Sequence, residues 1–272
     1  MILLAFGDVC GEAGLRIVSA KLRTLKKHYG ADVCVINGEN ADVLGVKPEQ
    51  AQQIFEAGAD VVTLGNHVWN RPQIIKEMKA NKYLLRPLNL APQTPGEGFV
   101  RLQLSSGRWL TVVCLVGRLF CEWNADSPFH VMERLLKTFK DEPESKDDLF
   151  AVDFHAEATS EKAAFAHCFD GRVSAVFGTH THVQTSDERV LPGGTGFITD
   201  LGMTGPRHSI LGVKVEQSVS NFMGNVPVRY EPPVTEAVIE GAVFTIDEAT
   251  GKCTGVERVR VEESSPAPAS AP

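Results

Sequence analysis

The feature that most constrains the fold is an alternation of short apolar runs with amphipathic segments along residues 1–120. Residues 1–6 and 32–36 are runs of strand length that are apolar except for Asp32, and residues 14–29 between them place leucine and valine at helical spacing among lysine and arginine. A strand, a helix and a second strand in this order predict a βαβ unit. Repetition of such units predicts an α/β fold around a largely parallel sheet.

Later segments extend this pattern. Helices are predicted at residues 48–57, 72–80, 129–139 and 160–168, strands at 59–64, 149–153, 173–177 and 196–199, and hairpins at 99–116 and 237–261. The first hairpin is expected to add an antiparallel edge, and the charged stretch 140–148 is expected to be a solvated loop. Because no repeat and no convincing linker is visible, residues 1–262 are predicted to form one domain and residues 263–272 a disordered tail.

Composition sets limits on the function. The chain of 272 residues is 43% apolar, which is enough to build a sizeable core. Its net charge of −7 argues against stable nucleic-acid binding, which needs a basic face. A small anionic substrate remains compatible with this charge because bound cations invert the local field.

The cysteines and the N-terminus indicate a compartment. The six cysteines show no Cys-x-x-Cys spacing, so they are predicted to be reduced thiols. The N-terminus lacks the basic flank of a signal peptide, and no apolar run approaches the length of a membrane span. We therefore expect a cytoplasmic protein without a membrane partner.

Polar side chains follow five of the predicted strands at the point where each apolar run ends. The clusters are Gly7-Asp8, Asn37-Gly38-Glu39-Asn40, Gly65-Asn66-His67, Asp153-Phe154-His155 and Gly178-Thr179-His180-Thr181-His182. Because open α/β sheets bind ligands beyond the carboxyl ends of their strands, these clusters are expected to converge. Carboxylate, amide and imidazole groups at one place predict a two-metal site suited to iron, manganese or zinc.

Individual residues suggest how such a site is built. Glu39 is the best candidate for a carboxylate that bridges two metals, because it follows a strand directly and Gly38 leaves room beside it. Asn40 offers a hard, neutral oxygen ligand. His180 and His182 are separated by one residue, so in extended backbone their side chains point to the same side, one toward each metal.

Single motifs in this set have ordinary alternative interpretations. Asp8 is equally suited to capping a helix or turn, and Gly65-Asn66 is also a turn signal. A lone histidine is more often a core or surface residue than a ligand. The position of the clusters after strands favours ligands at Asp8, Asn66 and His155 and a general acid at His67.

In their order and spacing these residues resemble the calcineurin-like metallophosphoesterases. The similarity runs from Asp8 to about Gly212 and includes Asp200-Leu201-Gly202-Met203-Thr204-Gly205-Pro206. It is strongest with a small bacterial branch, the 2′,3′-cyclic-nucleotide 2′-phosphodiesterases. The resemblance implies an αββα sandwich in which mixed sheets are flanked by helices, with the metal site at the carboxyl edge of the strands.

The resemblance also implies roles for single residues. It implies a first metal held by Asp8, Glu39, Asn40 and His182 and a second held by Glu39, Asn66, His155 and His180. Glu39 would bridge them, and His67 would donate a proton to the leaving ribose oxygen. Members of this branch are associated with iron, with manganese as a common substitute, and zinc is a further alternative.

Two positions differ from the wider superfamily. Where many members have Asp-x-His, this chain has Asp8-Val9-Cys10, and Cys10 is interpreted as a compact buried residue rather than a soft ligand. The superfamily usually bridges its metals with aspartate, whereas Glu39 matches the narrower branch.

The remaining polar candidates are interpreted as structural or exposed. Three of them lie in or at the start of predicted helices: His28, His130 and His167. Residues 193–196 are interpreted as a turn, because no helix start follows them as a phosphate-binding loop requires. His208 is a candidate for the substrate mouth, and Arg118 is a candidate either for a phosphate contact or for a plain surface role.

The predicted activity is hydrolysis of a 2′,3′-cyclic nucleotide, the expected small-molecule partner, to a 3′-monophosphate. A phosphomonoesterase or 3′,5′-cyclic phosphodiesterase stays open, because the motif fixes the chemistry and not the leaving group. A regulatory protein that binds a nucleotide and hydrolyses it slowly also stays open. A metal protein without catalysis is disfavoured by His67, which the two metals do not need. The metal, the base and homo-oligomer formation are left undetermined.

Overall fold

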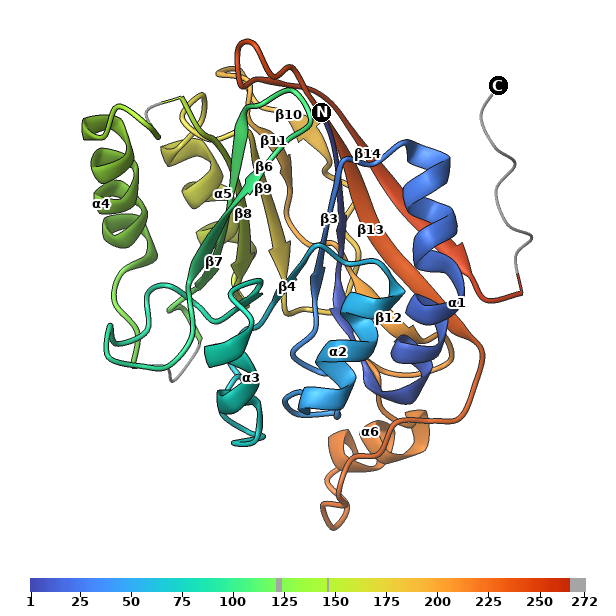
Figure 1. The fold of residues 1–272 in the computed structure, drawn as a ribbon. Coiled ribbons are helices and arrows are strands. Elements are labelled where there is room, and N and C mark those ends of the chain that lie inside the picture. The colour runs from blue at the N-terminus through green and yellow to red at the C-terminus, as the bar shows by residue number, and fades with distance from the viewer. Residues whose placement is uncertain (121–123, 146, 265–272) are drawn as a thin grey trace.

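Two mixed β-sheets stack face to face between outer layers of helices (Figure 1). The computed structural model describes residues 1–120, 124–145 and 147–264. The first sheet has eight strands, in the order β2 (Asp8–Val9), β12 (Met203–Pro206), β13 (Ala237–Ile246), β1 (Ile2–Phe6), β3 (Val33–Asn37), β4 (Val61–Thr63) and β5 (Leu84–Leu85), with β14 (Cys253–Glu262) paired to β13. The second has six, in the order β10 (Arg189–Val190), β11 (Gly196–Ile198), β9 (Ala175–Thr179), β8 (Leu149–His155), β7 (Trp109–Val116) and β6 (Phe99–Gln103). The predicted αββα class is confirmed.

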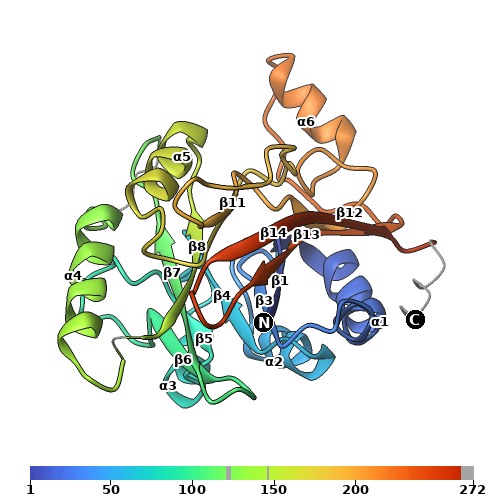
Figure 2. The same cartoon turned by 90° about the horizontal axis from the view of Figure 1, so that it is seen from above.

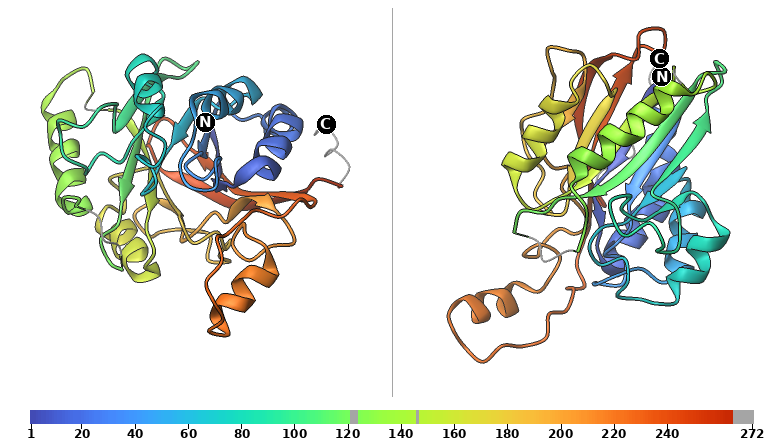
Figure 3. Two further views of the ribbon diagram at one scale, coloured as in Figure 1. Left: turned by 90° about the horizontal axis from the view of Figure 1, so that it is seen from below. Right: turned by 90° about the vertical axis from the view of Figure 1, so that its left-hand side faces the viewer.

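Helices cover the outer face of each sheet. On the first sheet lie α1 (Gly11–Tyr29) and α2 (Pro48–Ala57), and on the second lie α4 (Pro128–Asp141) and α5 (Thr159–Cys168) (Figure 2). The short α3 (Ile74–Ala80) precedes β5, and α6 (Val215–Phe222) lies on an arm that projects from the body (Figure 3). None of the helices in the described ranges has both the length and the apolar character needed to cross a bilayer.

Successive residues of the central strands face different cores. In β1, Leu3 and Ala5 lie in the core between the sheets, whereas Leu4 and Phe6 pack in the core that contains α1 and α2. Strand β8 divides its side chains in the same way between the central core and the core beneath α4 and α5. Because both faces are covered, these strands appear in the sequence as continuous apolar runs rather than as alternating ones.

Most predicted elements are present, with shifted ends. Both hairpins are confirmed as antiparallel pairs, β6 with β7 and β13 with β14, and β6 forms an edge of its sheet. Strand β8 runs through His155 and β9 through Thr179, so His155 is the last residue of a strand and not the residue beyond it. The apolar pattern does not predict β2, β5, β10 or β12, because strands of two to four residues are defined by their neighbours. It also does not predict helix α6, whose only buried residue is Ser218.

The end of the described chain is partly ordered. Glu263, which composition assigns to the tail, forms an ion pair with Arg16 at 2.7 Å and accepts a hydrogen bond from the Ala237 amide at 2.9 Å. Disorder is therefore the wrong prediction for Glu263, and residues 265–272 lie outside the described residues. The five described cysteines are free thiols, as predicted, and Cys121 lies outside the described part of the chain.

Candidate metal centre

The carboxyl ends of five strands meet at one edge of the sandwich. Strands β1, β3 and β4 run parallel in the first sheet, and β8 and β9 run parallel in the second. Each of the five polar clusters lies at the end of one of these strands. The topology therefore brings together side chains that are more than a hundred residues apart in the sequence, such as Glu39 and His155.

One group of ligand-type atoms surrounds His155. Its Nε2 atom lies 2.8 Å from Glu39 Oε1 and 2.7 Å from Asn66 Oδ1. It also lies 3.0 Å from His180 Nδ1. The ligand atoms of Glu39, His155 and His180 all fall within 4.8 Å of one another, the spacing expected around a single ion. These are the four residues assigned above to the second metal.

A second group lies beside the first. His182 Nε2 is 3.6 Å from Asp8 Oδ1 and 3.1 Å from the Asn40 amide nitrogen. The same amide nitrogen is 3.5 Å from Glu39 Oε1, so Glu39 lies between the two groups. This is the position that a bridging carboxylate requires.

His155 is oriented by a hydroxyl and a carboxylate behind it. Thr179 Oγ1 donates to Asp153 Oδ1 at 2.7 Å, so it accepts from His155 Nδ1 at 2.9 Å. This arrangement leaves the lone pair of His155 Nε2 directed at Glu39 and Asn66. A metal-binding histidine characteristically anchors its second ring nitrogen in this way.

The other two histidines are anchored by residues that the sequence does not connect to the site. His182 Nδ1 donates to the carbonyl of Leu211 at 3.0 Å, and His180 Nε2 lies 3.1 Å from Glu157. In each of the three rings, one nitrogen therefore contacts a partner outside the centre and the other nitrogen points at the centre. Leu211 and Glu157 carry no recognisable motif, so nothing local in the sequence assigns them to this role.

The centre has the chemistry of a cation site. Asp8 and Glu39 are fully buried, and the oxygen atoms Asp8 Oδ1 and Asn40 Oδ1 are buried without a hydrogen-bond partner among the described residues. A buried polar atom without a partner costs about 1–3 kcal/mol, and here several lone pairs also face one another. Metal ions bound between these atoms would satisfy them, so the residues fit two ions with Glu39 between them.

The buried carboxylates hold negative charge at the centre. Burial by itself raises the pKa of Asp8, but the nearby charge of His182, at 3.6 Å, and the hydrogen bond from the His180 amide outweigh it and hold the pKa well below its usual range. For Glu39 burial is likewise outweighed by the charge and hydrogen bond of His155, and its pKa is lowered. In Asp153, behind the centre, burial raises the pKa to about 6. Asp8 and Glu39 therefore supply fixed charge for cations.

Gly65 makes the close approach of the ligands feasible. A Cβ atom at this position would lie 2.4 Å from His155 Nε2 and 2.5 Å from Glu39 Oε2. Both distances are far below van der Waals contact, so any side chain here would displace the ring or the carboxylate. The glycine of the Gly65-Asn66-His67 cluster is therefore a requirement of the site and not only a turn residue.

The backbone of the two-histidine motif differs from the prediction. His180 and His182 have φ angles of 101° and 63°, so they do not lie in extended backbone and the argument from strand alternation is wrong for them. The loop is held instead by carboxylates. The His180 amide donates to Asp8 Oδ2 at 3.0 Å, and the Thr181 amide donates to Asp200 Oδ2 at 3.1 Å, which also binds the buried Lys162 at 2.7 Å.

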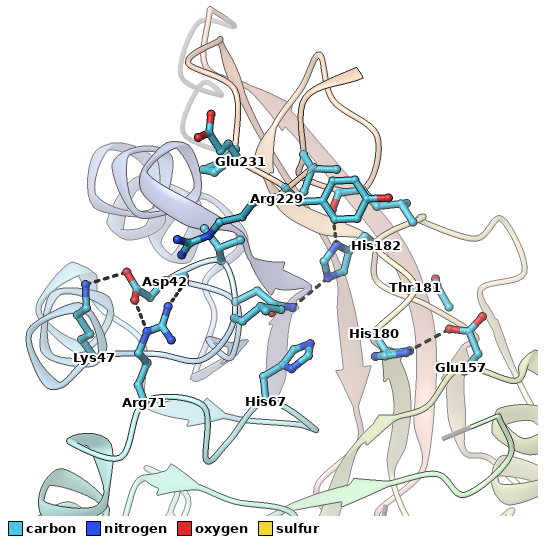
Figure 4. Close-up of a pocket in the computed structure, with 17 residues that line it drawn as sticks. Asp42, Lys47, His67, Arg71, Glu157, His180, Thr181, His182, Arg229 and Glu231 are labelled. Carbon is cyan, nitrogen blue, oxygen red and sulfur yellow. Dashed lines mark hydrogen bonds and ion pairs between the residues drawn. The ribbon is translucent and has the colours of Figure 1, made fainter. Parts of the chain in front are cut away.

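His67 lies on the wall of a cavity above the centre. The cavity has a volume of about 960 Å³ and is also lined by Asn40, His180 and His182 (Figure 4). The backbone amide of His67 donates to Glu39 Oε2 at 3.0 Å. Its ring Nε2 lies 3.2 Å from the side-chain nitrogen of Asn66, and its ring Nδ1 lies 3.3 Å from the side-chain nitrogen of Asn70. The ring is thus held beside the centre while it remains open to a ligand.

The structure also locates the remaining candidates. Cys10 is buried, and its sulfur lies 3.7 Å from His182 Nδ1. Arg118 and His208 are exposed and do not line the cavity. His130 and His167 are exposed on α4 and α5.

Comparisons with known proteins identify relatives over nearly the whole chain. A family model described as YmdB-like protein matches residues 4–259. The chain is 39% identical over 264 residues to the 2′,3′-cyclic-nucleotide 2′-phosphodiesterase of Bacillus subtilis. The alignment covers 97% of this chain and 98% of the relative. Among solved structures, a novel phosphatase from Mycoplasma pneumoniae superposes with a TM-score of 0.88 at 34% identity, over 96% of this chain and 93% of that one. A hypothetical protein from Thermus thermophilus superposes with a TM-score of 0.86 at 38% identity, over 97% and 100%.

Proposed function

The chain belongs to the YmdB-like family, a family of the metallophosphoesterase type, and on this premise we propose that it hydrolyses 2′,3′-cyclic nucleotides to 3′-monophosphates at a dinuclear metal centre. It is a hydrolase of phosphoric esters by its relationship to the phosphodiesterase and the phosphatase described above. The cyclic nucleotide as substrate and the binding of two metals are the proposed part of this function.

One observation carries the proposal. The predicted ligand residues come from separate strand ends and meet around a single buried carboxylate, Glu39. Metal ions bound there would lower the pKa of water and offset the charge of the phosphoryl oxygens. The nitrogen and oxygen donors suit iron, and manganese or zinc would fit the same set.

The residues of the cavity wall define the rest of the reaction. His67 faces the cavity and is not needed as a ligand, and in the proposed reaction it gives a proton to the leaving oxygen. Water adds to phosphorus and releases one proton to solvent, the bond between phosphorus and the ribose 2′ oxygen breaks, and that oxygen takes the proton from His67, which solvent then reprotonates. The product is a 3′-monophosphate.

A substrate panel with metal analysis tests the proposal. We expect metal-dependent conversion of 2′,3′-cyclic AMP to 3′-AMP, with slower turnover of 3′,5′-cyclic AMP and of 3′-AMP itself. Preferred release of phosphate from 3′-AMP would instead favour a phosphomonoesterase. Tight nucleotide binding without a metal-dependent product would favour the regulatory alternative.

A variant at His67 tests the acid directly. His67→Asn should reduce kcat about 100- to 10,000-fold, the usual contribution of a positioned acid, while the metal content stays at its wild-type value. His130→Asn, a change of the same kind at an exposed position, is the control. Full turnover by His67→Asn would exclude it as the proton donor.

A further inference from the structure

The wall of the cavity away from the candidate ligands carries excess positive charge. Lys47, Arg71 and Arg229 lie there with two carboxylates, Asp42 and Glu231, whereas Glu157 lies on the other side next to His180 (Figure 4). Three cations against two carboxylates, one of which is paired with Lys214, leave this wall positive. In a chain with a net charge of −7, such a concentration of cations inside one cavity points to an anionic ligand.

Asp42 is shared by two of the cations. Lys47 Nζ lies 2.9 Å from Asp42 Oδ1, and Arg71 Nε donates to Asp42 Oδ2. Arg71 is further fixed because Nη1 donates to the Asn70 carbonyl at 3.1 Å and Nη2 to the Asp42 carbonyl at 3.2 Å. Arg71 is therefore held in place, and the two cations share one carboxylate.

Arg229 is the cation without a hydrogen-bonded partner. It lies on the arm that follows α6, is exposed, and forms no hydrogen bond or ion pair within residues 1–120, 124–145 and 147–264. The nearby Glu231 is already paired with Lys214 at 2.6 Å. The Arg229 guanidinium thus keeps its donors for a ligand in the cavity, and guanidinium donors match a phosphate in charge and geometry.

We propose that Arg229, with Lys47 and Arg71, forms a subsite for a second phosphate, so that the preferred substrates are 2′,3′-cyclic nucleotides that also carry a 5′-phosphate. This inference rests on the proposed function, which places the cyclic phosphate at the metal centre. A nucleoside bound there extends its 5′ end away from the centre, and the cavity of about 960 Å³ leaves room for it. Two sources share this chemistry: a 5′-phosphorylated mononucleotide and the 3′ end of an RNA fragment.

Binding of product analogues tests the subsite independently of turnover. With Mn²⁺-loaded protein, titration calorimetry should show adenosine 3′,5′-bisphosphate binding about 10- to 100-fold more tightly than adenosine 3′-monophosphate, as a charge-assisted contact provides. Arg229→Gln should reduce this ratio at least about tenfold. Arg134→Gln, which removes the same charge from an exposed position on α4, should leave the ratio unchanged. Equal affinities in the wild type, or an unchanged ratio in Arg229→Gln, would overturn the subsite.

Kinetics then identify the source of the phosphate. Turnover of 2′,3′-cyclic AMP is compared with that of its 5′-phosphorylated form and of the dinucleotide UpA ending in a 2′,3′-cyclic phosphate. A higher kcat/KM for the dinucleotide than for the 5′-phosphorylated form assigns the subsite to RNA ends, and the reverse order assigns it to mononucleotides. If the binding ratio holds but none of the three is cleaved, the proposed activity fails while the second-phosphate subsite stands.

Discussion

Backbone strain is concentrated around the cavity. Four non-glycine residues that line it have positive φ: Val43 (67°), His180 (101°), His182 (63°) and Leu211 (52°). Each such conformation costs of the order of 1–3 kcal/mol and persists only where the surrounding structure fixes it. Two of these residues hold each other, because the Leu211 carbonyl accepts from His182. The strain thus serves to aim a ring nitrogen at Asp8.

The steric limit at Gly65 leads to a prediction. Gly65→Ala would place a methyl group 2.4 Å from His155 Nε2, so the ring must move away from Glu39 and Asn66. We expect metal affinity to fall by about 100-fold or more, at the upper end of the effect of disturbing a ligand's support, and turnover to fall with it. Metal titration of the purified apoprotein measures the change.

Gly255→Ala is the matched control for this variant. Nothing lies within 4 Å of the Cβ that it would add, so metal binding and turnover should stay at wild-type values. A Gly65→Ala protein that bound metal as tightly as Gly255→Ala would show that His155 is not a ligand in this geometry.

The residues of the centre could be predicted from the sequence for a specific reason. Ligand-type side chains directly after buried strands reveal themselves locally, and parallel strands then bring them to one edge, as they do for Asp8 and Glu39. The partners behind them could not be predicted in this way. The carbonyl of Leu211 has no side-chain signature, and Glu157 and Arg229 reach the site only through tertiary packing.

At the scale of elements, α1 is pressed against β12. A Cβ at Gly14 of this helix would lie 2.3 Å from the Thr204 carbonyl oxygen, a backbone atom that cannot rotate away. Helix propensity alone would make Gly14→Ala stabilising by about 1 kcal/mol, but overpacking costs about 1–3 kcal/mol. We therefore expect a net loss in the free energy of unfolding, measured by urea denaturation.

Ala20→Gly on the exposed side of α1 provides the comparison. It changes propensity without a steric contact and should destabilise the protein by about 1 kcal/mol. If Gly14→Ala proved more stable than the wild type, the helix would have to sit farther from β12 than the structure places it.

The elements could be predicted where their residues alternate or recur regularly. Helix α2 matches its predicted bounds at Pro48 and Ala57 because a proline begins it and Gly58 ends it with a φ of 118°. Strand β12 and helix α6 could not be predicted. The former is defined by pairing with β2 and β13, and the latter buries only Ser218 and leaves its apolar residues Val215, Val219 and Phe222 exposed.

At the scale of the whole molecule, aromatic side chains join the two sheets. Phe244 of β13 and Phe177 of β9 are buried, with ring centroids 5.8 Å apart in the core between the sheets. Phe244→Ala should lower the free energy of unfolding by about 3–5 kcal/mol, the usual cost of a large cavity. Guanidinium denaturation checks this value. Phe222→Ala, on the exposed face of α6, should change it by less than about 0.5 kcal/mol, and a similar loss in both variants would contradict the role of Phe244.

The apolar runs do not show how each central strand divides its side chains between the helices and the other sheet. Because every residue of a run such as 1–6 is apolar or small, the sequence predicts a buried strand but not which side chains face the helices and which face the other sheet. The resemblance to the metallophosphoesterases supplied the sandwich that the periodicity alone did not determine. The pairing of β13 with both β1 and β14 depends on contacts between distant parts of the chain.

The two ends of the described chain are linked by an ion pair with a pH signature. Arg16 of α1 donates two hydrogen bonds to Glu263, at 2.7 and 2.9 Å, and these bonds, against some burial, lower the pKa of Glu263 from 4.5 to about 2. A lowered carboxyl pKa means that the pair stabilises the fold above pH 4.5 and that this contribution is lost as the pH falls toward 2. Because both side chains are partly exposed, we expect about 1 kcal/mol or less.

Thermal denaturation of the wild type and Glu263→Gln between pH 2 and 7 tests this link. The wild type should have the higher Tm above pH 4.5, and the two curves should converge at the acid end, because the protonated Glu263 resembles glutamine. Glu144→Gln, at an exposed position, removes a carboxylate without this pair and should run parallel to the wild type. A Tm difference for Glu263→Gln that stayed constant down to pH 2 would mean that packing, and not the charge held by Arg16, makes Glu263 contribute to stability.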